Sequence, residues 1–187
     1  MSRKIAALTS ANLDDIPGPC GACRQWNPET RGVVDRLLRD WGSCGFVVYE
    51  GKQPVGFTVF GPPSYFPKSG LFPAGPVSSD ALFIACLHVD SEHRLAGVGK
   101  RLLHAIEKES HRREAIALEA LAGRDAERPP AVPVELFLKE GFFILRDDRR
   151  HPLVRLDIKS LAAWSAKAES ALEKLAIRQS APIKAPM

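Results

Sequence analysis

The segment Arg94–Gly99 constrains the fold of this 187-residue chain most, because it joins an apolar, strand-like run, Leu82–Val89, to a stretch with helical spacing. Its two glycines let the backbone approach a ligand without a Cβ atom in the way. The helix that follows leaves its first N–H groups unpaired and carries a partial positive charge at that end. This junction therefore favours a bound phosphate, to which Arg94 and Lys100 would add full charges.

Two common nucleotide-binding motifs do not fit this segment. A Rossmann fingerprint needs a third glycine three residues after Gly99, where Leu102 stands. A P-loop needs Ser or Thr after Lys100, where Arg101 stands. Two glycines before a helix also occur in simple tight turns, so the spacing alone leaves a turn and a phosphate loop open.

The segment resembles the coenzyme A loop of the GCN5-related N-acetyltransferases (GNAT), in which Arg or Gln is followed by Gly-x-Gly or Gly-x-Ala. Here the pattern is Arg94, Gly97 and Gly99, and it follows a Leu-x-Val strand end at Leu87–Val89. About forty residues later the chain has Leu136–Phe142, which is similar to a second motif of that family. The resemblance covers roughly Phe46–Ile158.

The resemblance implies transfer of an acetyl group from acetyl-CoA to a primary amine of a small molecule or of a protein lysine. It also implies that main-chain groups at the strand end hold the pantetheine and that those of the loop hold the pyrophosphate. The expected cofactor-binding residues are Leu87, His88, Val89, Arg94, Leu95, Ala96, Gly97, Val98, Gly99 and Lys100. A CoA-binding regulatory or scaffold protein without turnover is the alternative.

Two side chains that many members of that family use in catalysis are missing. The position of a proton-donating tyrosine holds Phe137, and that of an asparagine seven residues earlier holds Pro130. The central-strand positions where some members carry a carboxylate or histidine hold Phe83 and Ala85. A thiol with a pKa of about 8.5 leaves with little help, so these absences do not exclude catalysis.

The candidate catalytic residues are Tyr65 and Glu119. Tyr65 is the only tyrosine of a proline-rich segment, 61–79, that is expected to be a stiff, irregular loop. Glu119 lies on an expected strand beside the cofactor slot and is a candidate base. Cys86 and His88 alternate with Leu87 and Val89, so they are expected to face the other side of the sheet as packed strand residues unless a bulge intervenes.

Composition limits the class of protein. A chain of this length with 45% hydrophobic residues is expected to form one domain, residues 1–179, with a disordered tail at 180–187. The net charge of +4 is small and the basic residues are mixed with acids, so nucleic acid is not an expected partner. No apolar run is long enough to cross a membrane, and a cytoplasmic protein is predicted.

The four cysteines, Cys20, Cys23, Cys44 and Cys86, are too few for a disulfide framework, which also favours a reducing compartment. Cys20 and Cys23 have the spacing of half a zinc site, and Cys44 could supply a third thiolate. No second pair of ligands follows in the sequence, so no metal is predicted.

The periodicity predicts an α+β fold with a mixed, mainly antiparallel sheet flanked by helices. The resemblance adds that the central strands splay apart. A C-terminal amphipathic helix containing Trp164 must be covered by this domain or by a second copy, which leaves a homodimer open. The expected strands are 5–8, 46–49, 55–60, 81–89, 116–121, 142–145 and 153–158, and the expected helices are 29–41, 98–111, 134–140 and 159–178.

Overall fold

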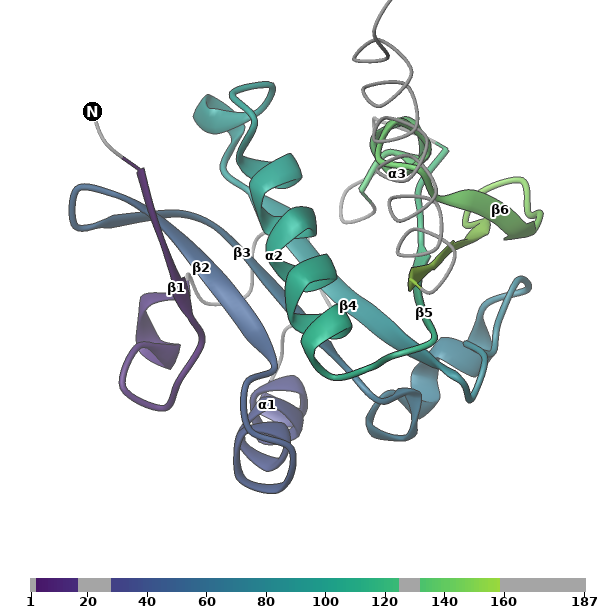
Figure 1. Ribbon diagram of the computed structural model, residues 1–187, viewed down its shortest axis with the longest axis horizontal. Coiled ribbons are helices and arrows are strands. Elements are labelled where there is room, and N and C mark those ends of the chain that lie inside the picture. Colours follow the sequence, from purple (N-terminus) through teal and green to yellow (C-terminus); the bar gives the residue numbers. More distant parts are fainter. Residues whose placement is uncertain (1–2, 17–27, 125–131, 159–187) are drawn as a thin grey trace, which may run out of the picture.

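A computed structural model describes residues 3–16, 28–124 and 132–158 (Figure 1). In this part of the chain, seven strands form one sheet in the order β1-β2-β3-β4-β5-β7-β6. Only β4 and β5 run parallel, and the other neighbours are antiparallel. The strands are β1 (Arg3–Ala7), β2 (Gly45–Glu50), β3 (Gln53–Gly61), β4 (Ala81–Val89), β5 (Ala117–Leu121), β6 (Phe143–Arg146) and β7 (Leu153–Asp157).

The helices cover both faces of this sheet. They are α1 (Pro28–Asp40), α2 (Val98–Arg112) and α3 (Val134–Lys139). Leu102 and Ile106 of α2 are fully buried with Val48 and Leu118 on one face, whereas Leu37 of α1 packs on the other face with the buried side chains of β2 and β3. Figure 1 shows α2 lying across the strands between the two edges of the sheet. The apolar stripe predicted for α2 is therefore its buried face.

A β-bulge interrupts β4 at its centre. Opposite it, Val59 of β3 pairs with Cys86 and Phe60 pairs with Ile84, which leaves Ala85 as the extra residue. Parallel pairing with β5 also ends at Ile84. The two central strands therefore separate at the bulge, and no described strand pairs with residues 85–89 of β4 on that side.

The proline-rich segment 62–79 packs on the sheet face opposite α2 and contains two short 3₁₀ turns, η2 (Pro63–Tyr65) and η3 (Pro67–Leu71). Phe66 packs edge-on against Phe83 of β4, with ring centroids 5.5 Å apart. Arg146 of β6 donates to the carbonyl of Ala74 at 2.7 Å and also to that of Pro76. The segment is thus fixed to the sheet at several points.

These observations confirm the predicted α+β fold and its mixed, splayed sheet. The first strand begins two residues earlier than expected, because Arg3 and Lys4 pair with β2, and Leu8 follows it with an N–H bond to Gly45. The predicted C-terminal helix and the tail lie outside the described residues. Among the described helices, none is long and apolar enough to cross a membrane.

Candidate active site

The loop before α2, which we call the phosphate loop (Asp90–Gly97), ends in a left-handed turn. Leu95 has a φ of +64° and Gly97, the N-cap of α2, has a φ of +78°. The first backbone bond of the helix runs from the Arg101 N–H to the Gly97 carbonyl at 3.1 Å. Within the described chain, the N–H groups of 97–100 have no acceptor, so they form a cluster of free donors at the positive end of the helix.

The unpaired part of β4 offers a second set of free backbone groups. Asp90 donates its N–H to Val55 of β3 at 3.1 Å, which shows that even-numbered residues here direct their polar groups toward β3. Backbone directions alternate along a strand, so Leu87 and Val89 direct theirs to the opposite edge, where β5 no longer pairs. We call the backbone of residues 85–89 the free edge of β4.

Gly99 sits where the free edge, α2 and α3 meet. A Cβ atom at this position would lie 3.3 Å from Leu136 Cδ2 and 3.8 Å from side-chain carbons of Leu87 and Val89. A glycine therefore keeps this approach open, and any larger residue would fill it. The sequence predicts that this glycine lets the backbone come close to a ligand, and the geometry is compatible with that role.

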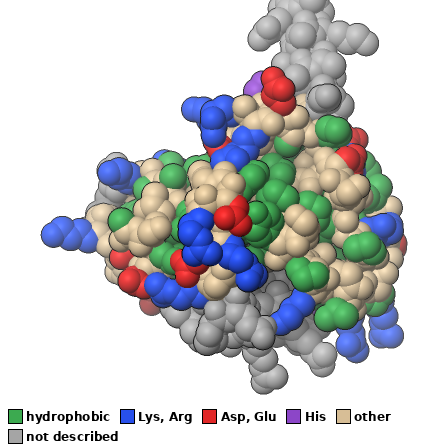
Figure 2. All heavy atoms as spheres, turned by 90° about the horizontal axis from the view of Figure 1, so that it is seen from below, with side chains coloured by type: hydrophobic (Ala, Val, Ile, Leu, Met, Phe, Trp, Pro, Cys, Tyr) green, Lys and Arg blue, Asp and Glu red, His purple; other side chains and the backbone are tan. Residues whose placement is uncertain are grey.

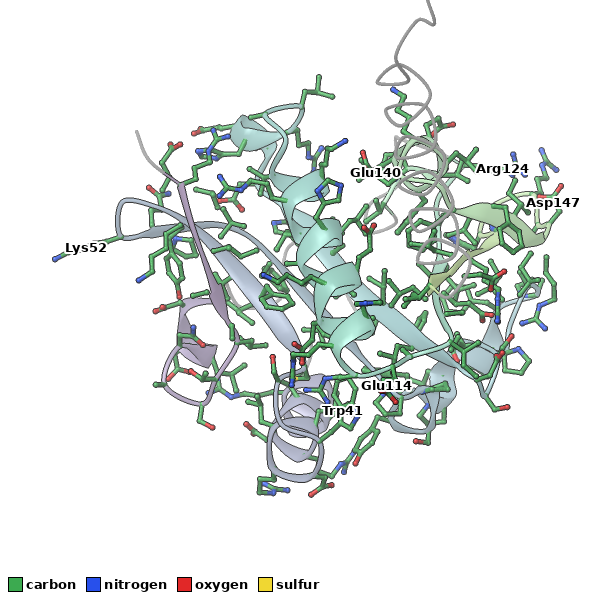
Figure 3. All side chains as sticks on the ribbon, in the orientation of Figure 1. Trp41, Lys52, Glu114, Arg124, Glu140 and Asp147 are labelled. Atoms are coloured by element: carbon green, nitrogen blue, oxygen red, sulfur yellow. The ribbon has the colours of Figure 1, made fainter. Side chains whose placement is uncertain are left out.

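The cation Lys100 is held by a carboxylate that the sequence reasoning missed. Glu140, labelled in Figure 3, accepts from Lys100 Nζ at 3.1 Å and lies 3.0 Å from His104 Nε2, and its side chain is only 9% exposed. It ties the first turns of α2 to the end of α3. Nearby, burial raises the pKa of Glu107, whose Oε1 has no partner among the described residues. Arg94 is exposed.

Tyr65 lies on η2, and its hydroxyl is 3.3 Å from Asp40 Oδ2 at the end of α1. Its ring packs against the buried cluster between α1 and the sheet. Burial, followed by the Asp40 charge, raises the pKa of Tyr65, so the phenol stays protonated at neutral pH. Tyr65 and Cys86 of β4 pack against this same cluster.

The structure argues against the predicted role of Glu119 as a base. The side chain is completely buried, and Arg155 Nη1 donates to one carboxylate oxygen at 2.8 Å. The other oxygen accepts the Ser78 N–H at 2.8 Å. Both oxygens are therefore engaged in holding segment 62–79 and β7 together, and the group faces away from α2.

The remaining titratable residues of β4 are packed on the face away from α2, as alternation from Leu87 and Val89 predicts. His88 Nε2 lies 3.2 Å from Asp90 Oδ1. The His88 ring is tilted relative to that of Phe57, with the two ring centroids 5.4 Å apart. Cys86 packs with the cluster beneath α1. Phe137, in place of the tyrosine, is buried against Phe142 and has no proton to donate.

The three cysteines whose spacing was compared with a zinc site are only partly described. Burial raises the pKa of the Cys44 thiol to about 12, which disfavours the thiolate that a metal would need. Cys20 and Cys23 lie outside the described residues. In the ranges that the structure covers, no group of three His, Cys, Asp or Glu side chains could hold a metal ion.

A separate hollow of about 700 Å³ lies at the opposite end of β4 from the phosphate loop. Figure 2 looks at this end of the molecule, where hydrophobic side chains gather beside Lys and Arg. Glu109 accepts from Arg112 and Arg113, and the Arg113 guanidinium stacks 3.8 Å above the Trp41 ring. These charges are satisfied internally, so the hollow shows no chemistry that would select a ligand.

An open mixed sheet whose central strands separate beside a helix N-terminus is the fold that the two sequence motifs imply. The sequence profile of the Acetyltransferase (GNAT) family matches residues 8–142, so the chain belongs to this family, whose members use acetyl-CoA. The resemblance of the two motifs is thereby confirmed.

Solved structures give the same fold. Ard1 from Thermoplasma volcanium aligns with a TM-score of 0.60 and 16% identity over 84% of this chain and 98% of that one. PaiA N-acetyltransferase from Thermoplasma acidophilum, in complex with coenzyme A, aligns with a TM-score of 0.57 and 12% identity over 84% of this chain and 99% of that one. Ribosomal-protein-S18-alanine N-acetyltransferase from Escherichia coli aligns with a TM-score of 0.57 and 15% identity over 84% of this chain and 94% of that one. No curated protein sequence matches the chain.

Proposed function

We propose that this protein is an acetyl-CoA-dependent N-acetyltransferase that acts on a primary amine of a small molecule or of a protein lysine. The observation that carries the proposal is the meeting of two sets of free backbone groups, the edge of β4 and the first turn of α2, at Gly99. Few ligands need both a line of amide partners and an anion site, and CoA has an amide-containing arm joined to a pyrophosphate.

The backbone of this chain would do most of the binding. We propose that Leu87 and Val89 pair with the amides of the pantetheine arm, and that the N–H groups of 97–100 hold the pyrophosphate. Lys100 and Arg94 would add charge at the same end. Bound acetyl-CoA would supply the acetyl group as an activated thioester. Holding an amine in line with that thioester supplies most of the rate by proximity.

The face of β4 away from α2 is our proposed side of approach for the amine, because α2 and α3 cover the other face. Segment 62–79 borders that face beside Phe83 and brings Tyr65 with it. We propose Tyr65 as the general acid, which would have to exchange its bond with Asp40 for one to the departing sulfur. The proton that the amine loses would pass to solvent water, from which Tyr65 would regain its own. Its raised pKa keeps the required proton in place.

A CoA-binding protein without turnover is the second candidate. It is favoured by the buried Phe137 at the position of the acid and by the engagement of both Glu119 oxygens. Such a protein would keep every backbone feature described above and lack only the proton transfers.

One pair of measurements separates these candidates. Calorimetry with CoA tests binding, and release of free thiol from acetyl-CoA in the presence of a panel of amines tests transfer. The enzyme should bind CoA and release thiol only with an accepted amine. Binding without release for any amine would support the second candidate, and absence of CoA binding would overturn both.

A further inference from the structure

The phosphate loop is fastened to three successive strands at three-residue steps. The N–H of Asp90 donates to Val55 of β3 at 3.1 Å. His93 Nε2 lies 3.3 Å from Oε2 of Glu50, the last residue of β2. The carbonyl of Ala96 accepts from Arg3 Nη1, on β1, at 2.8 Å. The loop thus reaches across the sheet to its edge strand before α2 begins.

Arg3 and Glu50 form the outermost of these anchors. They are opposite each other in the β1–β2 register, and Arg3 Nε donates to Glu50 Oε1 at 3.0 Å. Each side chain is 24% exposed. Hydrogen bonds from Arg3 and then His93 lower the pKa of Glu50, so the carboxylate stays charged. The planar guanidinium therefore spans two partners, one on β2 and one on the loop.

The contact with the Ala96 carbonyl has a consequence for the neighbouring residue. The carbonyl of Ala96 and the N–H of Gly97 belong to one planar trans peptide and point in opposite directions. A carbonyl fixed toward Arg3 therefore aims the Gly97 N–H away from β1, among the free donors at the start of α2. Arg101 closes the arrangement, because its Nη2 donates to the Arg3 carbonyl at 3.4 Å.

We propose that Arg3 and Glu50 are positioning residues for the phosphate site, which act by fixing the Ala96–Gly97 peptide and so the direction of the Gly97 N–H. This inference rests on the proposed function, because it takes CoA as the ligand. Neither side chain needs to touch the cofactor. The edge strand β1, three strands from β4 in the sheet, thereby sets the affinity of the cofactor loop.

Calorimetry of CoA binding to the full chain tests this role. Arg3→Ala should weaken CoA binding by roughly tenfold, the effect of one hydrogen bond to a charged group. Arg3→Lys keeps the charge but loses the two-partner geometry, so it should be weakened nearly as much. Lys4→Ala is the matched control, because it removes a charge from the same strand at an exposed side chain, and it should bind within about twofold of the unaltered protein.

Glu50→Ala distinguishes positioning from simple attraction, because the two predict opposite signs. Loss of a negative charge near an anion site would tighten CoA binding by electrostatics alone. If Glu50 positions Arg3, CoA binding should weaken, and the KM for acetyl-CoA should rise while kcat at saturation is kept. Glu50→Gln, a milder change, should not bind CoA more tightly than the unaltered protein. Thermal denaturation confirms that each variant is folded at the temperature used.

Tighter binding in Glu50→Ala, or full affinity in Arg3→Lys, would overturn the inference and leave the proposed function intact. If the unaltered protein itself bound no CoA, the proposed function would fail first and the inference with it.

Discussion

The two sides of β4 are built by different means. On the side of the phosphate loop, the free groups are backbone N–H and carbonyl groups, and a Cβ atom at Gly99 would lie 3.3 Å from Leu136 Cδ2. On the side of β5 and β7, charged side chains hold the structure, because Arg155 binds Glu119, Asp80 and Asp157 together. A site made of backbone tolerates most changes of sequence, whereas the ion cluster depends on its buried partner, Glu119. Substitutions beside the phosphate loop should therefore lower CoA affinity, whereas substitutions in the ion cluster should lower the stability of the fold.

The largest expected effect is on stability, from Glu119→Ala. This change leaves Arg155 without its buried partner and frees the N–H of Ser78, so unfolding should become easier by about 3–5 kcal/mol. Urea denaturation measures it. Asp157→Ala is the control, because it removes a half-exposed carboxylate from the same arginine and should cost no more than about 1 kcal/mol.

A different result would remove the contrast between the two sides. If Glu119→Ala left stability unchanged and abolished thiol release, the group would be a base and not a structural ion.

Next in size is Gly99→Glu, which should reduce CoA affinity at least about 100-fold, equivalent to roughly 2.7 kcal/mol. The side chain would meet Leu136 and place a negative charge against the pyrophosphate. Calorimetry against CoA is the measurement. Gly32→Glu, on α1 with open space around its Cβ position, is the matched control and should leave affinity unchanged. Equal affinity in the Gly99 variant would refute the whole assignment of the loop.

The same contrast explains what could be predicted from the sequence. Arg94, Gly97 and Gly99 are local in the chain, and the structure has the strand, turn and helix that the sequence predicts around them. The binding of a phosphate at this loop stays a prediction. Glu119 finds its partner 36 residues away in Arg155, which in turn binds Asp80 75 residues away. No spacing within one element reveals such a cluster, so the sequence left Glu119 free to act as a base.

The residues that hold the phosphate loop and the start of α2 could not be predicted from the sequence, for a related reason. Arg3 reaches Ala96 across 93 residues, and Glu140 reaches Lys100 from the end of another helix. The position of the bulge at Ala85 also needs the pairing partner on β3 to be known. Local elements such as the strand, turn and helix around Gly97 can thus be predicted from a single sequence, and side-chain contacts across the sheet cannot.

A smaller set of changes tests whether any side chain is needed for chemistry. Tyr65→Phe should lower kcat by at least about 100-fold if the phenol is the general acid, with CoA affinity unchanged. Tyr49→Phe is the control, because its hydroxyl bonds Asp15 at 2.6 Å on another part of the sheet. A fall in kcat of less than about threefold would instead indicate that the thiolate departs without a proton donor. Catalysis would then depend on backbone contacts and proximity alone.

The smallest expected effect concerns acid stability at the far end of α2. Hydrogen bonds from Arg112 and then Arg113 lower the pKa of Glu109 from its ordinary value of 4.5 to about 2. Because the folded-state pKa is the lower one, this pairing stabilises the fold fully above about pH 4.5 and is lost as the pH falls toward 2. Glu109→Gln should therefore lower the free energy of unfolding at pH 7 by no more than about 1 kcal/mol, because Arg112 is well exposed. The corresponding small decrease in Tm should vanish near pH 2. A Tm difference that persisted below pH 2 would show that Glu109 acts by packing and not by charge.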